Sequence, residues 1–150
     1  RPLAGAPRST MSSMWTRRTA LAAGIALLGV VGSGCSRGPS PDDPPVPQLP
    51  SDWKIVSDQI VDRHKVYEIE SRLEGRVKTA RATLCQAGEH KIQVNTVVAT
   101  ESSEADKMYR ILANRKPAYA YARKGDVLFE FVASVEAQDQ VKRGREAITP

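Results

Sequence analysis

The chain has 150 residues, 41% of them hydrophobic and 5% aromatic, which allows one domain with appendages and a small aliphatic core. Its formal charge is +5, but residues 1–34 contain four arginines and no acidic residue, so the rest of the chain holds 18 of the 22 basic residues against all 17 acidic ones. Composition therefore argues against a nucleic-acid-binding protein, whose domain would be strongly basic.

The N-terminal third has the layout of a secretion signal. Arg17 and Arg18 form a short positive region, and residues 20–31 (ALAAGIALLGVV) follow without a charge. This uncharged run is too short to span a bilayer, which needs ~20 residues, but it suits the hydrophobic region of a signal peptide. We expect translation to start at Met11 or Met14.

The residues after this run carry the clearest motif. Gly32-Ser33-Gly34-Cys35 resembles the lipobox of bacterial lipoprotein signal peptides: Ser33, Gly34 and Cys35 match it, and Gly32 stands where leucine is usual. The resemblance implies that residues 1–34 are a leader and signal peptide and that Cys35 carries a diacylglycerol. It also implies an anchor in a bacterial cell membrane or outer membrane, with the protein on the extracytoplasmic side.

Other interpretations of this N-terminal region stay open. An ordinary secretory signal, or a membrane helix that is never cut, would share the positive and apolar regions. Export by the general secretory route and by the twin-arginine route both fit the paired arginines.

Residues 35–52 are expected to be a tether between the lipid and the domain. Their six prolines disfavour helices and sheet ladders. A proline-rich stretch adopts extended polyproline II at ~3.1 Å per residue, so the tether would reach on the order of 50 Å. We therefore predict a spacer that lifts the domain off a membrane.

Residues 53–150 are expected to fold as one α+β domain. Alternating apolar residues predict strands, spacings of three and four predict helices, and the order is β-α-β-β-α-β-β-α. Strands are predicted over 52–61, 76–86, 90–100 and twice within 118–133, and helices over 64–75, 102–117 and 134–148. We expect a small antiparallel sheet with two or three helices on one face, of the ferredoxin-like βαββαβ type, with a cystatin-like sheet as the alternative.

The hairpin between the second and third predicted strands decides whether a metal site forms. A register that placed Cys85 opposite His90 would, with His64, offer soft metal ligands. The register shifted by one residue pairs Leu84 with Ile92 and matches apolar residues with apolar ones. Because a one-residue slip exchanges the faces of a strand, we expect the second register, with Cys85 and His90 on opposite faces and no metal site.

The remaining candidates for chemistry have simpler interpretations. Cys85 has no nucleophile-elbow setting, so we expect a covered strand cysteine. Glu68, Glu70 and Glu74 fall opposite the apolar stripe of their predicted helix, which is typical of a solvated surface. We predict no catalytic residue, no metal and no cofactor.

One basic cluster is a candidate contact surface. Arg115, Lys116, Arg123 and Lys124 flank the fourth predicted strand and would gather at one end of the sheet. Such a patch would contact anionic lipid headgroups or a cell-wall polymer, whereas scattered solvated charge is the simpler alternative.

These features together predict a lipid-anchored, non-enzymatic module of the cell envelope. Its partners would be the membrane, through the diacylglycerol on Cys35, and another envelope protein or a cell-wall polymer, but no nucleic acid. The alternative is an envelope enzyme or small-ligand-binding protein with a site built from loops, and a concave pocket with convergent polar groups would favour it.

Overall fold

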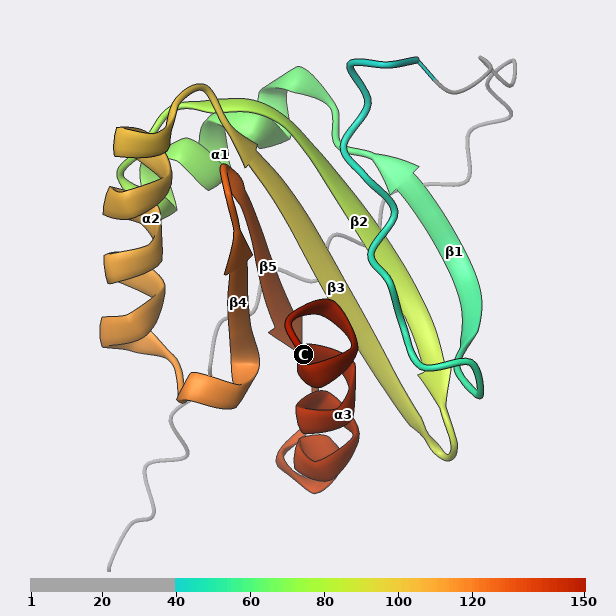
Figure 1. Ribbon diagram of the computed structural model, residues 1–150. Helices are drawn as coiled ribbons and strands as arrows, with labels where there is room; N and C mark the ends of the chain where they lie inside the picture. Colours follow the sequence, from blue (N-terminus) through green and yellow to red (C-terminus); the bar gives the residue numbers. More distant parts are fainter. Residues whose placement is uncertain (1–39) are drawn as a thin grey trace, which may run out of the picture.

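The computed structural model describes residues 40–150 (Figure 1). The signal peptide predicted at residues 1–34 and the lipidation predicted at Cys35 lie outside the described residues. Within the described range, no helix combines the length and the apolar character needed to cross a bilayer.

Five antiparallel strands form one sheet in the order β1-β2-β3-β5-β4. Each predicted strand and helix is found within a few residues of its expected position. The strands are β1 (Lys54–Ile60), β2 (Val77–Ala87), β3 (His90–Ala99), β4 (Tyr121–Lys124) and β5 (Val127–Val132). The helices are α1 (Arg63–Leu73), α2 (Ser102–Arg115) and α3 (Gln138–Ile148). Single 3-10 turns lie at η1 (Ala118–Ala120) and η2 (Val135–Ala137).

The α+β class predicted from sequence is confirmed. Helix α1 connects β1 to β2, yet these two strands are adjacent and antiparallel. In the split βαβ arrangement of ferredoxin-like domains, a helix connects two parallel strands. The strand order therefore differs from that arrangement, and the long curved ribbons of β2 and β3 (Figure 1) are nearer to the alternative of a sheet wrapped on a helix.

The helices cover both faces of the sheet (Figure 1). Helices α1 and α2 share one face, as expected, whereas α3 packs on the opposite face. Because β3 and β5 are buried on both sides, the sheet needs cover on both. The first core contains Val66, Leu73, Val97, Met108, Leu112 and Leu128; the second contains Trp53, Cys85, Ile92, Val94, Phe129, Phe131 and Val141.

The register of the β2–β3 hairpin differs from the prediction. Cys85 pairs with Ile92 and Leu84 with Gln93, one residue away from the expected match of Leu84 with Ile92. Both faces of β3 are core, so matching apolar rows did not distinguish the registers. The buried Thr83 faces the second core without penalty, because its hydroxyl donates to Asp58 Oδ1 at 2.9 Å.

Turn geometry selects this register. Two-residue loops join β2 to β3 and β4 to β5, and the first loop residue is Gly88 (φ 61°) or Gly125 (φ 62°). A hairpin turn of type II′ needs a positive φ at this position, which glycine adopts without steric cost. A glycine followed by one acidic residue is thus the local signal that places both turns.

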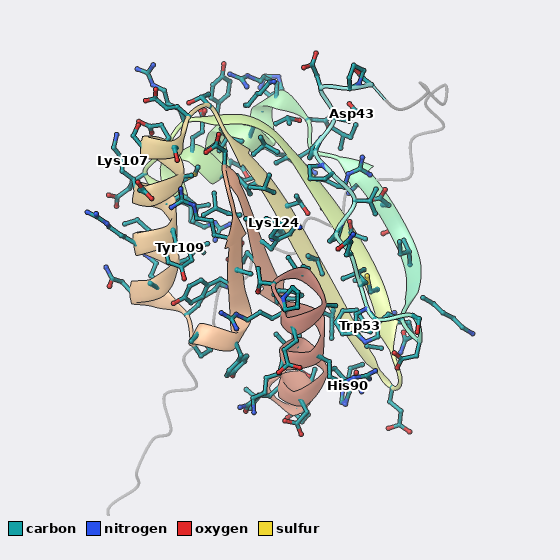
Figure 2. The ribbon with its side chains drawn as sticks, in the orientation of Figure 1. Asp43, Trp53, His90, Lys107, Tyr109 and Lys124 are labelled. Carbon is teal, nitrogen blue, oxygen red and sulfur yellow. The ribbon has the colours of Figure 1, made fainter. Side chains whose placement is uncertain are left out.

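The proline-rich segment is partly docked on the domain, contrary to the tether predicted over 35–52. Pro44 and Pro47 are buried, and the carbonyl of Pro44 accepts a hydrogen bond from Arg81 Nε at 2.9 Å. The segment runs across β2 between β1 and α3, with Asp43 and Trp53 near its two ends (Figures 1 and 2). We call residues 44–53 the strap.

The strap covers apolar surface that α3 does not reach. Leu49 packs against the second core, and Trp53 is buried beside α3, where its Nε1 donates to Gln140 Oε1 at 3.3 Å. A Cβ added at Gly144 of α3 would lie 2.6 Å from Trp53 Cη2, so the glycine lets the indole pack against the helix backbone. The folded unit therefore begins near Pro44 rather than at residue 53.

Candidate functional site

A groove of about 380 Å³ lies between α1, the C-terminal end of α2 and the segment that joins β5 to α3. Charged side chains come mainly from the two helices, and apolar ones from η1, β5 and η2. The charged lining residues are Lys65, Glu68, Arg72, Arg115, Lys116 and Glu130, and the larger apolar ones are Ile69, Tyr119, Phe131, Val132, Val135 and Val141.

Glu130 of β5 forms the charged floor of this groove, with its side chain only 3% exposed. Arg72 Nη1 and Nη2 donate to its two oxygens at 2.8 and 2.7 Å. Lys116 Nζ lies 3.0 Å from Oε1, and Asn95 Nδ2 donates to Oε2 at 3.2 Å. A buried carboxylate requires such partners, and here they arrive from α1, the end of α2 and β3.

The protonation of Glu130 follows from these contacts. Burial by itself would raise its pKa, but the hydrogen bonds and charges of Arg72 and Lys116 outweigh it and lower the pKa from 4.5 to about 2. The carboxylate is therefore ionised at neutral pH. A general acid or base would have a pKa near the working pH, so Glu130 is suited to holding cations rather than to moving protons.

Pro117 explains why Lys116 reaches the floor. The residue before a proline is sterically disfavoured in the helical conformation. Lys116 accordingly has an extended backbone (φ −131°, ψ 151°), although its N–H still bonds to the carbonyl of Leu112. The chain leaves α2 at this point, and the ammonium group reaches Glu130.

The charge of the groove remains positive after its internal pairs are counted. Four basic side chains and two acidic ones line it, which leaves an excess of two positive charges. Arg72 has both terminal nitrogens on Glu130, and Arg115 donates to the carbonyl of Arg72 and lies 3.7 Å from Glu74. Lys65 has no ion pair with any residue between 40 and 150.

Apolar side chains form the other wall of the groove. Phe131 and Val132 come from the end of β5, Tyr119 from η1, and Val135 begins η2. Val135 is 80% exposed, so it presents apolar surface at the rim of the groove. The groove therefore has a cationic side and an apolar side.

The structure separates the four residues of the predicted basic patch. Arg115 and Lys116 lie at the C-terminal end of α2. Arg123 forms an ion pair with Asp106 and donates to Ser102 Oγ at 3.3 Å, near the other end of the same helix. A helix of this length separates its ends by ~20 Å, so Arg123 and its neighbour Lys124 are distant from the groove.

The register of the hairpin also changes the relation between Cys85 and His90. Cross-strand partners share a face, so the pairs Cys85–Ile92 and Ala87–His90 put both residues on the same face, and the expectation of opposite faces is wrong. His64 is exposed on α1, which covers the other face of the sheet. In residues 40–150, no cluster of three potential metal ligands is found.

Cys85 itself is fully buried in the second core. Burial, and then the charge of Asp58, raise the pKa of its thiol to about 11. The thiol is therefore protonated at neutral pH and is a poor nucleophile.

Two acidic side chains accept hydrogen bonds from backbone N–H groups at the turn between α1 and β2. Glu70 Oε1 accepts the N–H of Val77 at 2.8 Å, and Glu104 Oε2 accepts the N–H of Arg76 at 2.8 Å. Glu104 also lines a second, more open cleft beside Gly75 and Lys107. Because Lys107 Nζ binds its other oxygen at 2.7 Å, its carboxylate is occupied by contacts within the fold.

Sequence reasoning missed the network around Glu130. The one available signal was a carboxylate within the apolar strand VLFEFV, since a charged residue in a buried strand needs a partner. Its partners, Arg72 and Asn95, lie 58 and 35 residues away in the chain.

Comparison of the chain with protein-family models, with curated proteins and with solved structures finds no match.

Proposed function

We propose that this chain is a lipid-anchored binding module on the extracytoplasmic side of a bacterial membrane, with the groove above Glu130 as its binding site. The anchor would be the diacylglycerol on Cys35, as the lipobox-like motif predicts. The envelope location in a cell membrane or outer membrane rests on the same motif. The binding role rests on the groove.

The observation that carries the binding role is the make-up of the groove. It is concave, partly apolar and of the size that small ligands occupy, with a few charged groups converging on its floor. A small ligand fits this shape better than a flat protein surface does. This favours the small-ligand form of a binding module over a protein–protein contact.

The docked strap limits how far the domain stands from its anchor. Only eight residues lie between Cys35 and Pro44, where the chain is already buried on the domain. A fully extended chain covers at most ~3.3–3.6 Å per residue, so the reach from the lipid is about 30 Å. This is less than the reach on the order of 50 Å expected for a free tether.

Mass spectrometry of the chain purified from the bacterial membrane tests the anchor. We expect an acylated N-terminal Cys35 and release of the Cys35→Ala variant from the membrane fraction. An unmodified Cys35 in a soluble chain would refute the anchored module.

Crosslinking in intact cells tests the binding site. A photoreactive residue at Val135, on the rim of the groove, should capture a ligand or partner, whereas the same residue at Lys124 should not. Equal capture at both positions, or none at either, would count against the groove as the binding site.

A further inference from the structure

We infer that the groove binds a small amphiphilic anion, in which a carboxylate or phosphate group meets Lys116 and Lys65 while a short apolar body lies against Val132 and Val135. This inference rests on the proposed role of the groove as a binding site. It names the chemical class of the ligand.

The sign of the ligand's charge follows from the inventory of donors. Lys116 has one ion-pair partner among residues 40–150, Glu130, and its side chain is 25% exposed, so donors of its ammonium remain for a ligand. Lys65 forms no ion pair with the described residues, and both lysines line the groove. Two cations with unused donors favour an anion, whereas a cationic ligand would meet the positive excess.

Glu130 acts as a positioning residue for this site. Both its oxygens are occupied by Arg72, Lys116 and Asn95, so it has little capacity to bind a ligand itself. Glu130 holds the ammonium of Lys116 at the floor of the groove. The side chain of Lys116 therefore loses less conformational entropy when a ligand binds.

The apolar body of the ligand follows from the second wall. Val132 lies next to the charged floor because it follows Glu130 by two residues on β5, so the two side chains share a face. Val135, 80% exposed, continues this apolar surface at the start of η2. Burying apolar area stabilises a complex by ~25 cal/mol per Å². A ligand with both groups should therefore bind more tightly than inorganic phosphate, which contacts the charges alone.

Calorimetric titration of the full chain in phosphatidylcholine nanodiscs tests the inference, with empty nanodiscs as the blank. The probes are hexyl phosphate, hexanoate, inorganic phosphate and hexyltrimethylammonium. We expect the two amphiphilic anions to bind, inorganic phosphate to bind at least several-fold more weakly, and the cation not to bind. Added NaCl should weaken binding, because it screens the lysines.

Matched variants identify the lysines that bind the anionic group of the ligand. Lys116→Gln and Lys65→Gln should each weaken binding of the amphiphilic anions, Lys116→Gln by about 10-fold, which corresponds to a charge-assisted hydrogen bond. Lys124→Gln makes the same charge change outside the groove and should have no effect. Lys65→Gln removes no ion pair of the described fold, so it remains informative if Lys116→Gln unfolds.

Several results would overturn the inference. They are equal binding of the cation, equal loss in Lys65→Gln and Lys124→Gln, or no binding of any probe to the wild-type chain. None of these results would contradict the proposed lipid-anchored binding module, because acylation of Cys35 and capture at Val135 are measured separately.

Discussion

Removing the buried charge of Glu130 is the sharpest test of the site. Glu130→Gln keeps the shape of the side chain but leaves Arg72 and Lys116 without their counter-charge. The pKa of Glu130 is about 2 in the folded protein against 4.5 for the free side chain, a difference of ~2.5 units. Each unit corresponds to 1.36 kcal/mol, so ionisation of Glu130 stabilises the fold by about 3 kcal/mol at neutral pH.

The pH dependence of this effect has a definite sign. Because the folded-state pKa of Glu130 lies below its unfolded value, the stabilisation is fully present above pH 4.5 and is lost as the pH falls towards 2. The wild-type chain should therefore exceed Glu130→Gln in free energy of unfolding by about 3 kcal/mol at pH 7 and by about 1 kcal/mol at pH 3.

Urea unfolding followed by circular dichroism at both pH values measures this difference. Glu68→Gln is the matched control, since Glu68 is exposed in the same groove and forms no ion pair within residues 40–150. The control should change stability by less than ~0.5 kcal/mol. A Glu130→Gln effect below ~1 kcal/mol at pH 7, or one that does not shrink at pH 3, would refute the reasoning.

Three further predictions concern the strap and the second core. A proline-specific endopeptidase should cleave slowly after Pro47 because this residue is buried, and mass spectrometry that finds rapid cleavage there would contradict the docked strap. Gly144→Ala should lower the free energy of unfolding by about 1–3 kcal/mol, since the new methyl would meet Trp53 at 2.6 Å; an unchanged urea midpoint would count against this packing. Cys85 should react with a thiol reagent at pH 8 only after denaturation, because it is buried and its pKa is raised to about 11, and rapid reaction of the native chain would show that the thiol is accessible.

Local patterns in the chain were enough to predict its elements. Apolar spacing marked the helices and the buried strands, and the helical face of Ala137, Val141, Gly144 and Ile148 is the buried face of α3 and its preceding turn. These predictions succeed because an element that packs on the core needs an apolar stripe, and the period of the stripe reports the backbone geometry. Strand β1 is the exception, since it is exposed along its whole length and is held by its pairing with β2.

Predictions of how one segment of the chain packs or pairs with another were wrong at two places. The β2–β3 register was wrong because both rows of β3 are core, and the glycine turn rather than the apolar match decided it. Residues 44–52 were predicted as a free spacer because proline excludes regular structure. An irregular segment can still pack, and here it covers β2 where α3 does not.

The sequence alone thus determined the order of elements, the α+β class and the prediction of an anchored protein, since these depend on neighbours within a few residues. Only the tertiary structure decided which charges meet. Arg115 and Arg123 are close in sequence but lie near opposite ends of α2, whereas Arg72 and Glu130 are 58 residues apart and form a bidentate pair. The groove depends on such contacts between distant segments. The local sequence around Glu130 shows that a buried carboxylate needs a cation, but nothing near it in the chain says which cation that is.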